Sequence, residues 1–201
     1  MRLKLILLSA VLGLVGGSCS LTESDSELCF IGDSITYFWD VEYYFPGYHT
    51  WKHAVIGARA QDVDDWDISD CRGVPVVLLM GTNNIGDVAI TDADAAQRRE
   101  MFEKTFLDLA QQIDANPLWV ISILPRRAEE KPTDEVNKNI ELVNDMIRKD
   151  LDSLGSAFKY IDVFDYFLED GYQANLRLFK DGLHLNVEGY ELLTSKVQAE
   201  L

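Results

Sequence analysis

Short, mainly apolar runs alternate with longer amphipathic segments along most of the chain. Four of these runs are typical of strands buried on both faces; they span residues 28–31, 74–80, 118–124 and 158–163. Residues 48–55 form a weaker fifth candidate, because polar side chains interrupt the run. The pattern therefore predicts several short strands separated by other elements.

Hydrophobic residues between the later runs recur with helical spacing. Thr91 and Asp94 resemble a helix start of capping-box type with Asp in place of Glu, and Asn116-Pro117 ends that segment. A second helix is predicted from about residue 133, and Gly155 closes it. Its apolar stripe consists of Val136, Ile140, Val143, Ile147 and Leu151. A last helix is predicted over residues 187–199.

Alternating strands and helices with fully apolar strands imply a parallel sheet covered on both sides. We therefore expect an α/β fold of flavodoxin-like type, a three-layer α/β/α sandwich around a five-stranded parallel sheet. Binding sites in such sheets form at the carboxyl ends of the strands.

The charge balance limits the classes of partner. The 201 residues include 18 Lys and Arg against 34 Asp and Glu, which gives a net charge of −16. No basic surface is expected for a nucleic-acid backbone or for an anionic membrane. The length suits one domain.

The first 27 residues differ from the rest of the chain. Residues 1–18 have a basic start and an apolar run too short to span a bilayer, as in a signal peptide. Cys19 follows Gly-Gly-Ser and could carry a lipid anchor, whereas ordinary cleavage would leave its thiol free. Residues 19–27 are acidic and suggest a tether, so the folded domain should span residues 28–201. We expect an exported protein, periplasmic or at the cell surface.

Two further cysteines, Cys29 and Cys71, could pair in an exported protein, although a cysteine inside an apolar run is more often simply buried. The sequence lacks CxxC and HExxH patterns and clusters of His with Cys. No metal site is therefore expected.

Residues that could take part in catalysis follow three of the predicted strands. Asp33 and Ser34 come directly after the first strand, where either could cap a helix or Ser34 could present a nucleophilic hydroxyl. Gly57 follows the second strand and could offer a free backbone N–H or simply form a turn. Asn83 follows the third strand and could donate to an oxyanion or make an Asx-turn.

Near the C-terminus, Asp181 and His184 lie three residues apart just before the last helix. A serine nucleophile needs a histidine base and a carboxylate that orients that base. The alternative places Asp181 in a plain turn and His184 near the helix N-terminus.

Together these segments resemble the four ordered blocks of the SGNH, or GDSL-type, hydrolases. The likeness covers residues 28–201, and the third block is similar to the branch resembling platelet-activating-factor acetylhydrolase. The matching residues are Gly32-Asp33-Ser34, Gly57, Gly81-Thr82-Asn83, Asp181 and His184.

The resemblance implies a role for each residue. Ser34 would be the nucleophile, His184 the general base and Asp181 its orienting partner. The backbone N–H groups of Ser34 and Gly57 and the side chain of Asn83 would form the oxyanion hole. Neither metal nor organic cofactor would be needed.

The chain departs from the family pattern at two positions. The second block often reads Ile-Gly-Gly, so Ala58 could supply the oxyanion N–H instead of Gly57. Asn84 replaces a frequent Asp in the third block, at a position that we expect to be structural.

The expected reaction is hydrolysis of small acyl esters, acetyl in particular, on a soluble alcohol or a glycan. The modest loop at residues 126–132 and the absence of a long lid insertion favour a small acyl group. Aromatic residues crowd positions 37–51 and could either wall a pocket or pack helix against sheet. The alternatives are a lysophospholipase or thioesterase for longer acyl chains, and a binding module without turnover.

Overall fold

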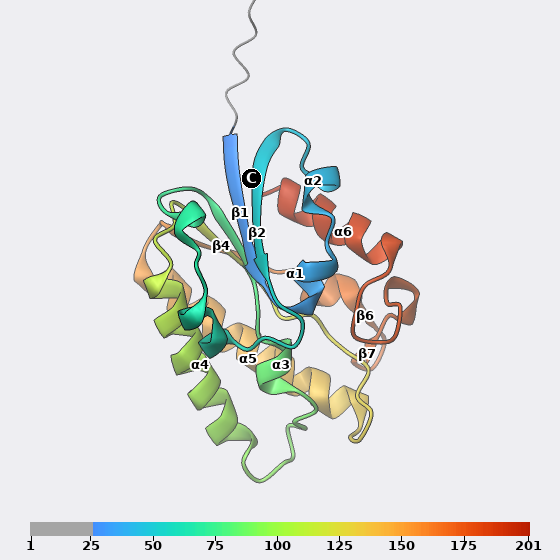
Figure 1. Cartoon of the computed structure of the whole chain (residues 1–201). Coiled ribbons are helices and arrows are strands. Elements are labelled where there is room, and N and C mark those ends of the chain that lie inside the picture. The colour runs from blue at the N-terminus through green and yellow to red at the C-terminus, as the bar shows by residue number, and fades with distance from the viewer. Residues whose placement is uncertain (1–25) are drawn as a thin grey trace, which may run out of the picture.

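Five parallel strands form the central sheet of the computed structural model, which describes residues 26–201 (Figure 1). The spatial order is β2-β1-β3-β4-β5. The strands are β1 (Ser26–Gly32), β2 (Tyr48–Ala54), β3 (Val76–Leu79), β4 (Leu118–Ile121) and β5 (Phe158–Ile161). The predicted five-stranded parallel sheet and three-layer α/β/α architecture are confirmed.

Helices cover both faces of the sheet. One layer contains α4 (Ala95–Gln112) and α5 (Thr133–Leu154), and the other contains α1 (Ser34–Phe38), α2 (Val41–Tyr44) and α6 (Val187–Gln198). Successive side chains of β1 point to opposite faces of the sheet. Cys29 and Ile31 pack with α4 and α5, whereas Leu28 and Phe30 pack with α1 and α6. This double burial explains why residues 28–31 of β1, and all of β3 and β4, lack polar side chains.

Short elements that the sequence pattern did not predict connect the long ones. These are α3 (Thr82–Ile85), the 3-10 helices η1 (Ala60–Asp65), η2 (Ser69–Cys71), η3 (Phe164–Phe167) and η4 (Leu176–Leu178), and the hairpin β6 (Leu168–Glu169) with β7 (Gln173–Ala174). Single turns and two-residue strands are too short to give a hydrophobic period.

The start of the domain differs from the prediction. Strand β1 begins at Ser26, so Ser26 and Glu27 pair with Tyr48 and His49 of β2 instead of belonging to an acidic tether. The predicted signal peptide 1–18 and the rest of the tether, with Cys19, lie outside the described residues.

The predicted capping box at the start of α4 is wrong. Asp94 is the N-cap residue, but its side chain accepts no capping hydrogen bond; it instead binds Arg98 Nε at 2.8 Å. The hydroxyl of Thr91 donates to Glu135 on the neighbouring helix α5. A residue one turn further along α4 has therefore taken the Asp94 side chain, and a residue of α5 has taken that of Thr91.

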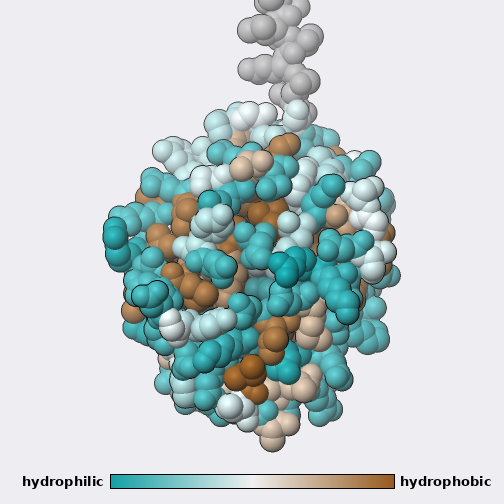
Figure 2. All heavy atoms as spheres, turned by 180° about the vertical axis from the view of Figure 1, so that it is seen from behind, coloured by the Kyte–Doolittle hydropathy of each residue, from teal (hydrophilic) through white to brown (hydrophobic). Residues whose placement is uncertain are grey.

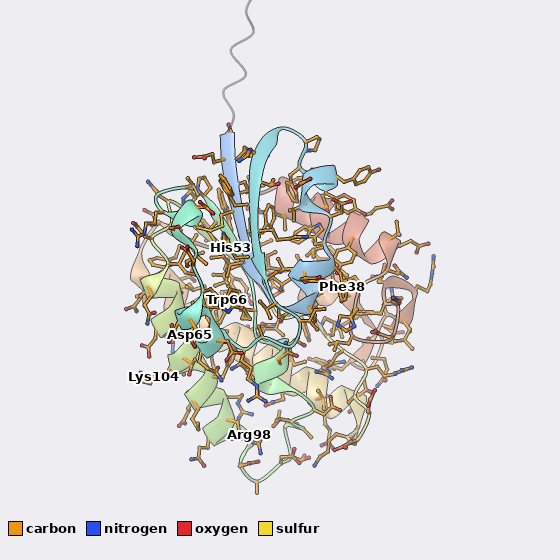
Figure 3. The ribbon with its side chains drawn as sticks, in the orientation of Figure 1. Phe38, His53, Asp65, Trp66, Arg98 and Lys104 are labelled. Carbon is orange, nitrogen blue, oxygen red and sulfur yellow. A yellow bond between two sulfur atoms is a disulfide. The ribbon has the colours of Figure 1, made fainter. Side chains whose placement is uncertain are left out.

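Cys29 of β1 and Cys71 of η2 form a disulfide, with Cα atoms 5.5 Å apart. Both residues are also buried, so the two cysteines are at once paired with each other and part of the core. His53 of β2 lies beside the disulfide (Figure 3), but the bonded sulfur atoms cannot act as thiolate ligands for a metal.

Polar side chains dominate the face seen in Figure 2, and hydrophobic ones appear there in small separate patches. Within residues 26–201, no helix combines the length and apolarity needed to cross a membrane.

Candidate active site

Ser34 is placed by the sharp transition from β1 into α1. Asp33 is the N-cap of this short helix, and its Oδ1 accepts the N–H of Ile35 at 3.0 Å. The capping role thus falls to Asp33, which leaves the Ser34 hydroxyl for another partner. As the first residue of α1, Ser34 also has a backbone N–H without an intrahelical acceptor.

Gly32 allows α1 to fold back against the sheet. A Cβ at this position would collide with the Thr36 side chain and lie 2.5 Å from the Leu79 carbonyl oxygen. Only glycine therefore permits this approach, and the approach brings Ser34 over the carboxyl edge.

His184 and Asp181 reach the same edge from the loop before α6. His184 Nε2 lies 3.0 Å from Ser34 Oγ, and His184 Nδ1 lies 2.8 Å from Asp181 Oδ2. The second carboxylate oxygen, Oδ1, accepts the backbone N–H groups of Leu183 and His184 at 3.0 and 2.8 Å. Both alternatives for Asp181 are thus true: it shapes a turn and contacts the imidazole.

The same contacts control the charge of Asp181. Burial works to raise the pKa of its carboxyl, but the hydrogen bonds from the His184 ring and from the N–H groups of His184 and Leu183 hold that pKa at about 2. Asp181 is therefore ionised throughout the neutral range and favours the His184 tautomer with hydrogen on Nδ1.

Arg127 supports the loop that carries these two residues. Its backbone N–H donates to Gly182 O at 2.8 Å, and its guanidinium donates to Asp181 O at 3.2 Å. The preceding residue, Arg126, forms an ion pair with Asp87, with Nε 3.2 Å from Oδ1. Neither contact of Arg127 could be read from the sequence, because they span 54 positions or more of chain.

Contacts between α1 and α6 fix the two halves of the site relative to each other. Tyr190 Oη donates to Ile35 O at 2.7 Å, and Trp39 Nε1 donates to Thr194 Oγ1 at 3.0 Å. All four groups are buried or nearly so. Sequence patterns gave no indication of these contacts.

Gly57 lies in a turn that follows β2. The Ala58 N–H donates to Val55 O at 3.1 Å, and Gly57 holds a φ of +79° at the third position. A type II turn needs glycine there. Since this turn uses the Ala58 N–H, while Gly57 N–H has no hydrogen bond among the described residues, Gly57 is the better oxyanion donor of the two.

Asn83 is held by the same loop. Its Nδ2 donates one hydrogen to Ala58 O at 2.8 Å, so the second hydrogen remains for a ligand. The neighbouring Asn84 accepts from Ala60 N and donates to Gln61 Oε1, each at 3.0 Å. Asn84 therefore has a structural role, as we expected, because it ties α3 to η1.

Register brings the predicted oxyanion donors near the nucleophile. Gly32 pairs with Ala54 of β2 on one side and with Leu79 of β3 on the other. Gly57 and Asn83 thus follow the strands that flank β1, at the same edge as Ser34. The structure places Ser34, His184 and Asp181 in direct contact, and Gly57 and Asn83 are joined through Ala58.

Asp33 is a second carboxyl of the site, and it is almost fully buried. Burial raises its pKa from 3.8 to about 6, against the lowering effect of the hydrogen bond from Ile35 N–H, the charge of His184 and the hydrogen bond from Gly81 N–H. The side chain thereby links the Ser34 turn to the loop that leads to Asn83.

The aromatic segment at residues 37–51 divides between two uses. Trp39 and Phe45 are buried in the core, as the packing interpretation predicted. Phe38 is half exposed on α1 (Figure 3), and its ring lies 5.4 Å from that of His184. Val55 and Ile56 are also about half exposed near the site.

Comparison with known families agrees with this geometry. Residues 30–192 match the model of the GDSL-like lipase/acylhydrolase family. The chain belongs to this family and is a carboxylic ester hydrolase. A comparison with curated protein sequences gives no significant match.

Solved structures share the fold at low sequence identity. A GDSL-like lipase from Bacteroides thetaiotaomicron has 15% identity and a TM-score of 0.66, with 89% of this chain and 88% of that chain covered. A Streptococcus pneumonia protein described as a candidate platelet activating factor has 22% identity, a TM-score of 0.64, and coverage of 91% and 86%. Axe2, an acetylxylan esterase from Geobacillus stearothermophilus, has 15% identity, a TM-score of 0.62, and coverage of 87% and 93%.

Proposed function

We propose that the protein is an exported serine esterase that removes small acyl groups, acetyl above all, from carbohydrates through an acyl-enzyme. The observation that carries this proposal is the hydrogen-bonded series Ser34–His184–Asp181, with distances of 3.0 and 2.8 Å. These are the contacts that a nucleophile, a general base and an orienting carboxylate require.

In the proposed mechanism, His184 Nε2 takes the hydroxyl proton as Ser34 Oγ attacks the ester carbonyl. Negative charge develops on the carbonyl oxygen, which faces the N–H groups of Ser34 and Gly57 and the free hydrogen of Asn83 Nδ2. The tetrahedral species collapses, and the leaving alcohol takes the proton from His184. Water then repeats the same steps on the acyl-Ser34 ester and releases the acid.

Two further observations support the finer parts of the proposal. The Cys29–Cys71 disulfide suits an oxidising compartment outside the cytosol, which supports export. The similar fold of an acetylxylan esterase supports an acetylated glycan as substrate.

A second candidate is an esterase for longer acyl chains. The half-exposed side chains of Phe38, Val55 and Ile56 near the site favour it, because such a rim could hold an alkyl chain. A chain-length series of nitrophenyl esters decides between the two: preference for acetate supports the first candidate, and rising kcat/KM with chain length supports the second.

The experiment that tests the proposed chemistry compares nitrophenyl acetate hydrolysis by the wild type, Ser34→Ala and His184→Ala. Both substitutions should lower kcat by about 10³-fold or more, because triad members act as a unit. Ser153→Ala, an exposed serine on α5, is the matched control and should keep wild-type activity. Absence of turnover in the wild type, with no labelling of Ser34 by a fluorophosphonate, would favour the binding module.

A further inference from the structure

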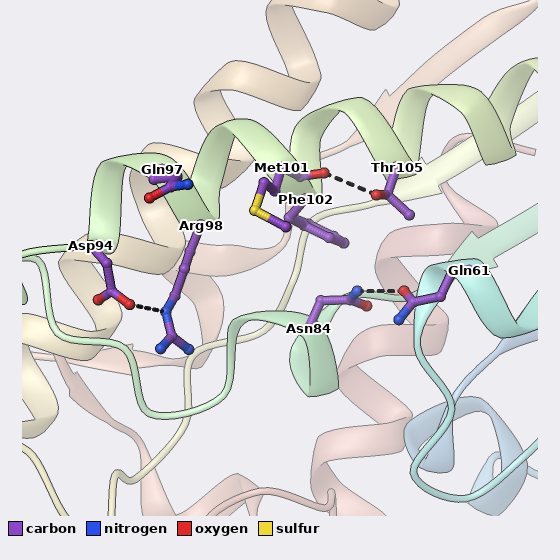
Figure 4. A pocket seen from close by; sticks show the side chains of 8 residues that line it. All are labelled: Gln61, Asn84, Asp94, Gln97, Arg98, Met101, Phe102 and Thr105. Atoms are coloured by element: carbon purple, nitrogen blue, oxygen red, sulfur yellow. Dashed lines mark hydrogen bonds and ion pairs between the residues drawn. The ribbon is translucent and has the colours of Figure 1, made fainter.

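A long groove continues from the candidate active site across the surface of α3 and α4. Two open cavities of about 510 and 500 Å³ lie next to each other, because Asn84, Asp94 and Arg98 line both. The near end of the groove contains Asn83. Its far end, drawn in Figure 4, reaches Thr105 of α4. We call these two cavities together the α3–α4 groove.

The groove is connected to the chemistry through Asn83. This residue lines the near cavity and is also the proposed side-chain donor of the oxyanion hole. Because the proposed acyl group is acetyl, the part of a substrate long enough to extend from Asn83 into the groove is its alcohol part.

The groove is larger and more polar than an acetyl group or an alkyl chain requires. Amide side chains of Gln61, Asn84 and Gln97 line the far cavity together with the Thr105 hydroxyl. Asn84 donates to Gln61 and the Thr105 hydroxyl donates to Met101 O, whereas the Gln97 amide has no hydrogen-bond partner among the described residues. Gln97 can therefore both donate to and accept from a ligand rich in hydroxyl groups. Met101, 64% exposed, offers an apolar surface beside them for the C–H face of a sugar ring.

Charges in the groove are compensated. Arg98 binds Asp94 at 2.8 Å, Lys131 binds Asp92 at 2.7 Å, and Asp87 binds Arg126 at 3.2 Å. The remaining charged residues along the wall, Arg59 and Glu130, have opposite signs. The lining holds three cations and four carboxylates, and Arg126 outside the lining compensates the fourth carboxylate. This near balance favours an uncharged ligand, and the overall charge of −16 disfavours a polyanion.

We propose that the α3–α4 groove binds a neutral glycan chain on one side of the acylated sugar. This inference rests on the proposed esterase function and deepens it, because it assigns the enzyme to a polymeric substrate and names the specificity residues. Gln97 supplies hydrogen bonds to sugar hydroxyls, and Met101 supplies the apolar contact.

The test separates polymer binding from catalysis. The double variant Gln97→Ala/Met101→Ala is compared with the wild type on acetylated xylo-oligosaccharides and on nitrophenyl acetate. Its kcat/KM on acetylated xylohexaose should fall about tenfold further than on nitrophenyl acetate, mainly through KM. Gln111→Ala, an exposed position on α4 outside the groove, is the control and should change neither activity.

In the wild type, kcat/KM should rise from acetylated xylobiose to xylohexaose. An equal effect of the double variant on both substrates, or no gain with chain length, would overturn the groove assignment while leaving the esterase intact. Preference for acetylated galacturonan oligomers would refute the neutral ligand.

Calorimetric binding of unacetylated xylohexaose to Ser34→Ala gives a result that does not depend on turnover. Binding that the double substitution weakens about tenfold supports the groove even if the acyl specificity is wrong. Absence of binding at millimolar sugar contradicts it.

Discussion

Replacement of Asp33 by asparagine tests whether burial destabilises the ionised form of the Asp33 carboxyl, next to the nucleophile Ser34. Asn is as good an N-cap residue as Asp, so the start of α1 should be kept. The variant loses one titrating group and gains no bulk. If the substitution weakens the contact with Gly81 N–H, the variant loses the same amount of unfolding free energy at every pH. Such a constant loss does not affect the pH dependence that is compared below.

The expected size follows from the pKa of Asp33, which rises from 3.8 to about 6 on folding because the side chain is buried. This difference of about 2 pH units corresponds to roughly 3 kcal/mol of unfolding free energy. Because the folded pKa is the higher one, the wild type has this stability fully below pH 3.8 and loses it as the pH rises through 6.

The assay is urea unfolding of the wild type and Asp33→Asn from pH 3.5 to 8. The difference between their unfolding free energies should move by about 3 kcal/mol in favour of the variant between about pH 4 and 7 and then stay level. Asp134→Asn is the control, because hydrogen bonding to Lys138 lowers the pKa of Asp134. The wild type should therefore lose stability relative to Asp134→Asn as the pH falls, which is the opposite direction from Asp33→Asn. A flat Asp33 curve would refute the reasoning.

Other predictions concern the proposed catalytic groups and the fold. Asn83→Ala should lower kcat on nitrophenyl acetate by about 10²–10³-fold with little change in KM, measured by steady-state kinetics. Asp181→Asn should lower kcat by several orders of magnitude at pH 7, because the His184 tautomer is no longer fixed. Gly32→Ala should destabilise the domain in thermal unfolding, since its Cβ meets the Leu79 carbonyl. Cys71→Ala should cost roughly 2–4 kcal/mol in urea unfolding relative to the disulfide-bonded wild type, and reduction of the wild type, as the control, should cause a similar loss.

The sequence predicted the main layers because their patterns are strong. Residues 28–31 of β1 and the strands β3 and β4 are wholly apolar because both of their faces are covered. The Val136–Leu151 stripe on α5 repeats at helical spacing. The edge strand β2 gave a weaker signal, because its burial is only partial. Boundaries were less certain: β1 starts at Ser26 since backbone pairing with β2 continues beyond the apolar run.

The contacts of the candidate site were predictable only in part. Ser34, Asp181 and His184 stand in recognisable short motifs, and the structure brings them together. The choice between Gly57 and Ala58 required the turn itself, because only its hydrogen bond reveals which N–H is used. Support from Arg127 and Tyr190 comes from distant parts of the chain, where a single sequence carries no local signal.

The link between α1 and α6 has a consequence for biosynthesis. Tyr190 and Thr194 hold the nucleophile helix from positions near the end of the chain, and His184 itself lies 150 residues after Ser34. A growing polypeptide that has not yet reached His184 therefore carries Ser34 without its general base. Its ability to cleave esters should therefore arise only after the final helix has docked against α1.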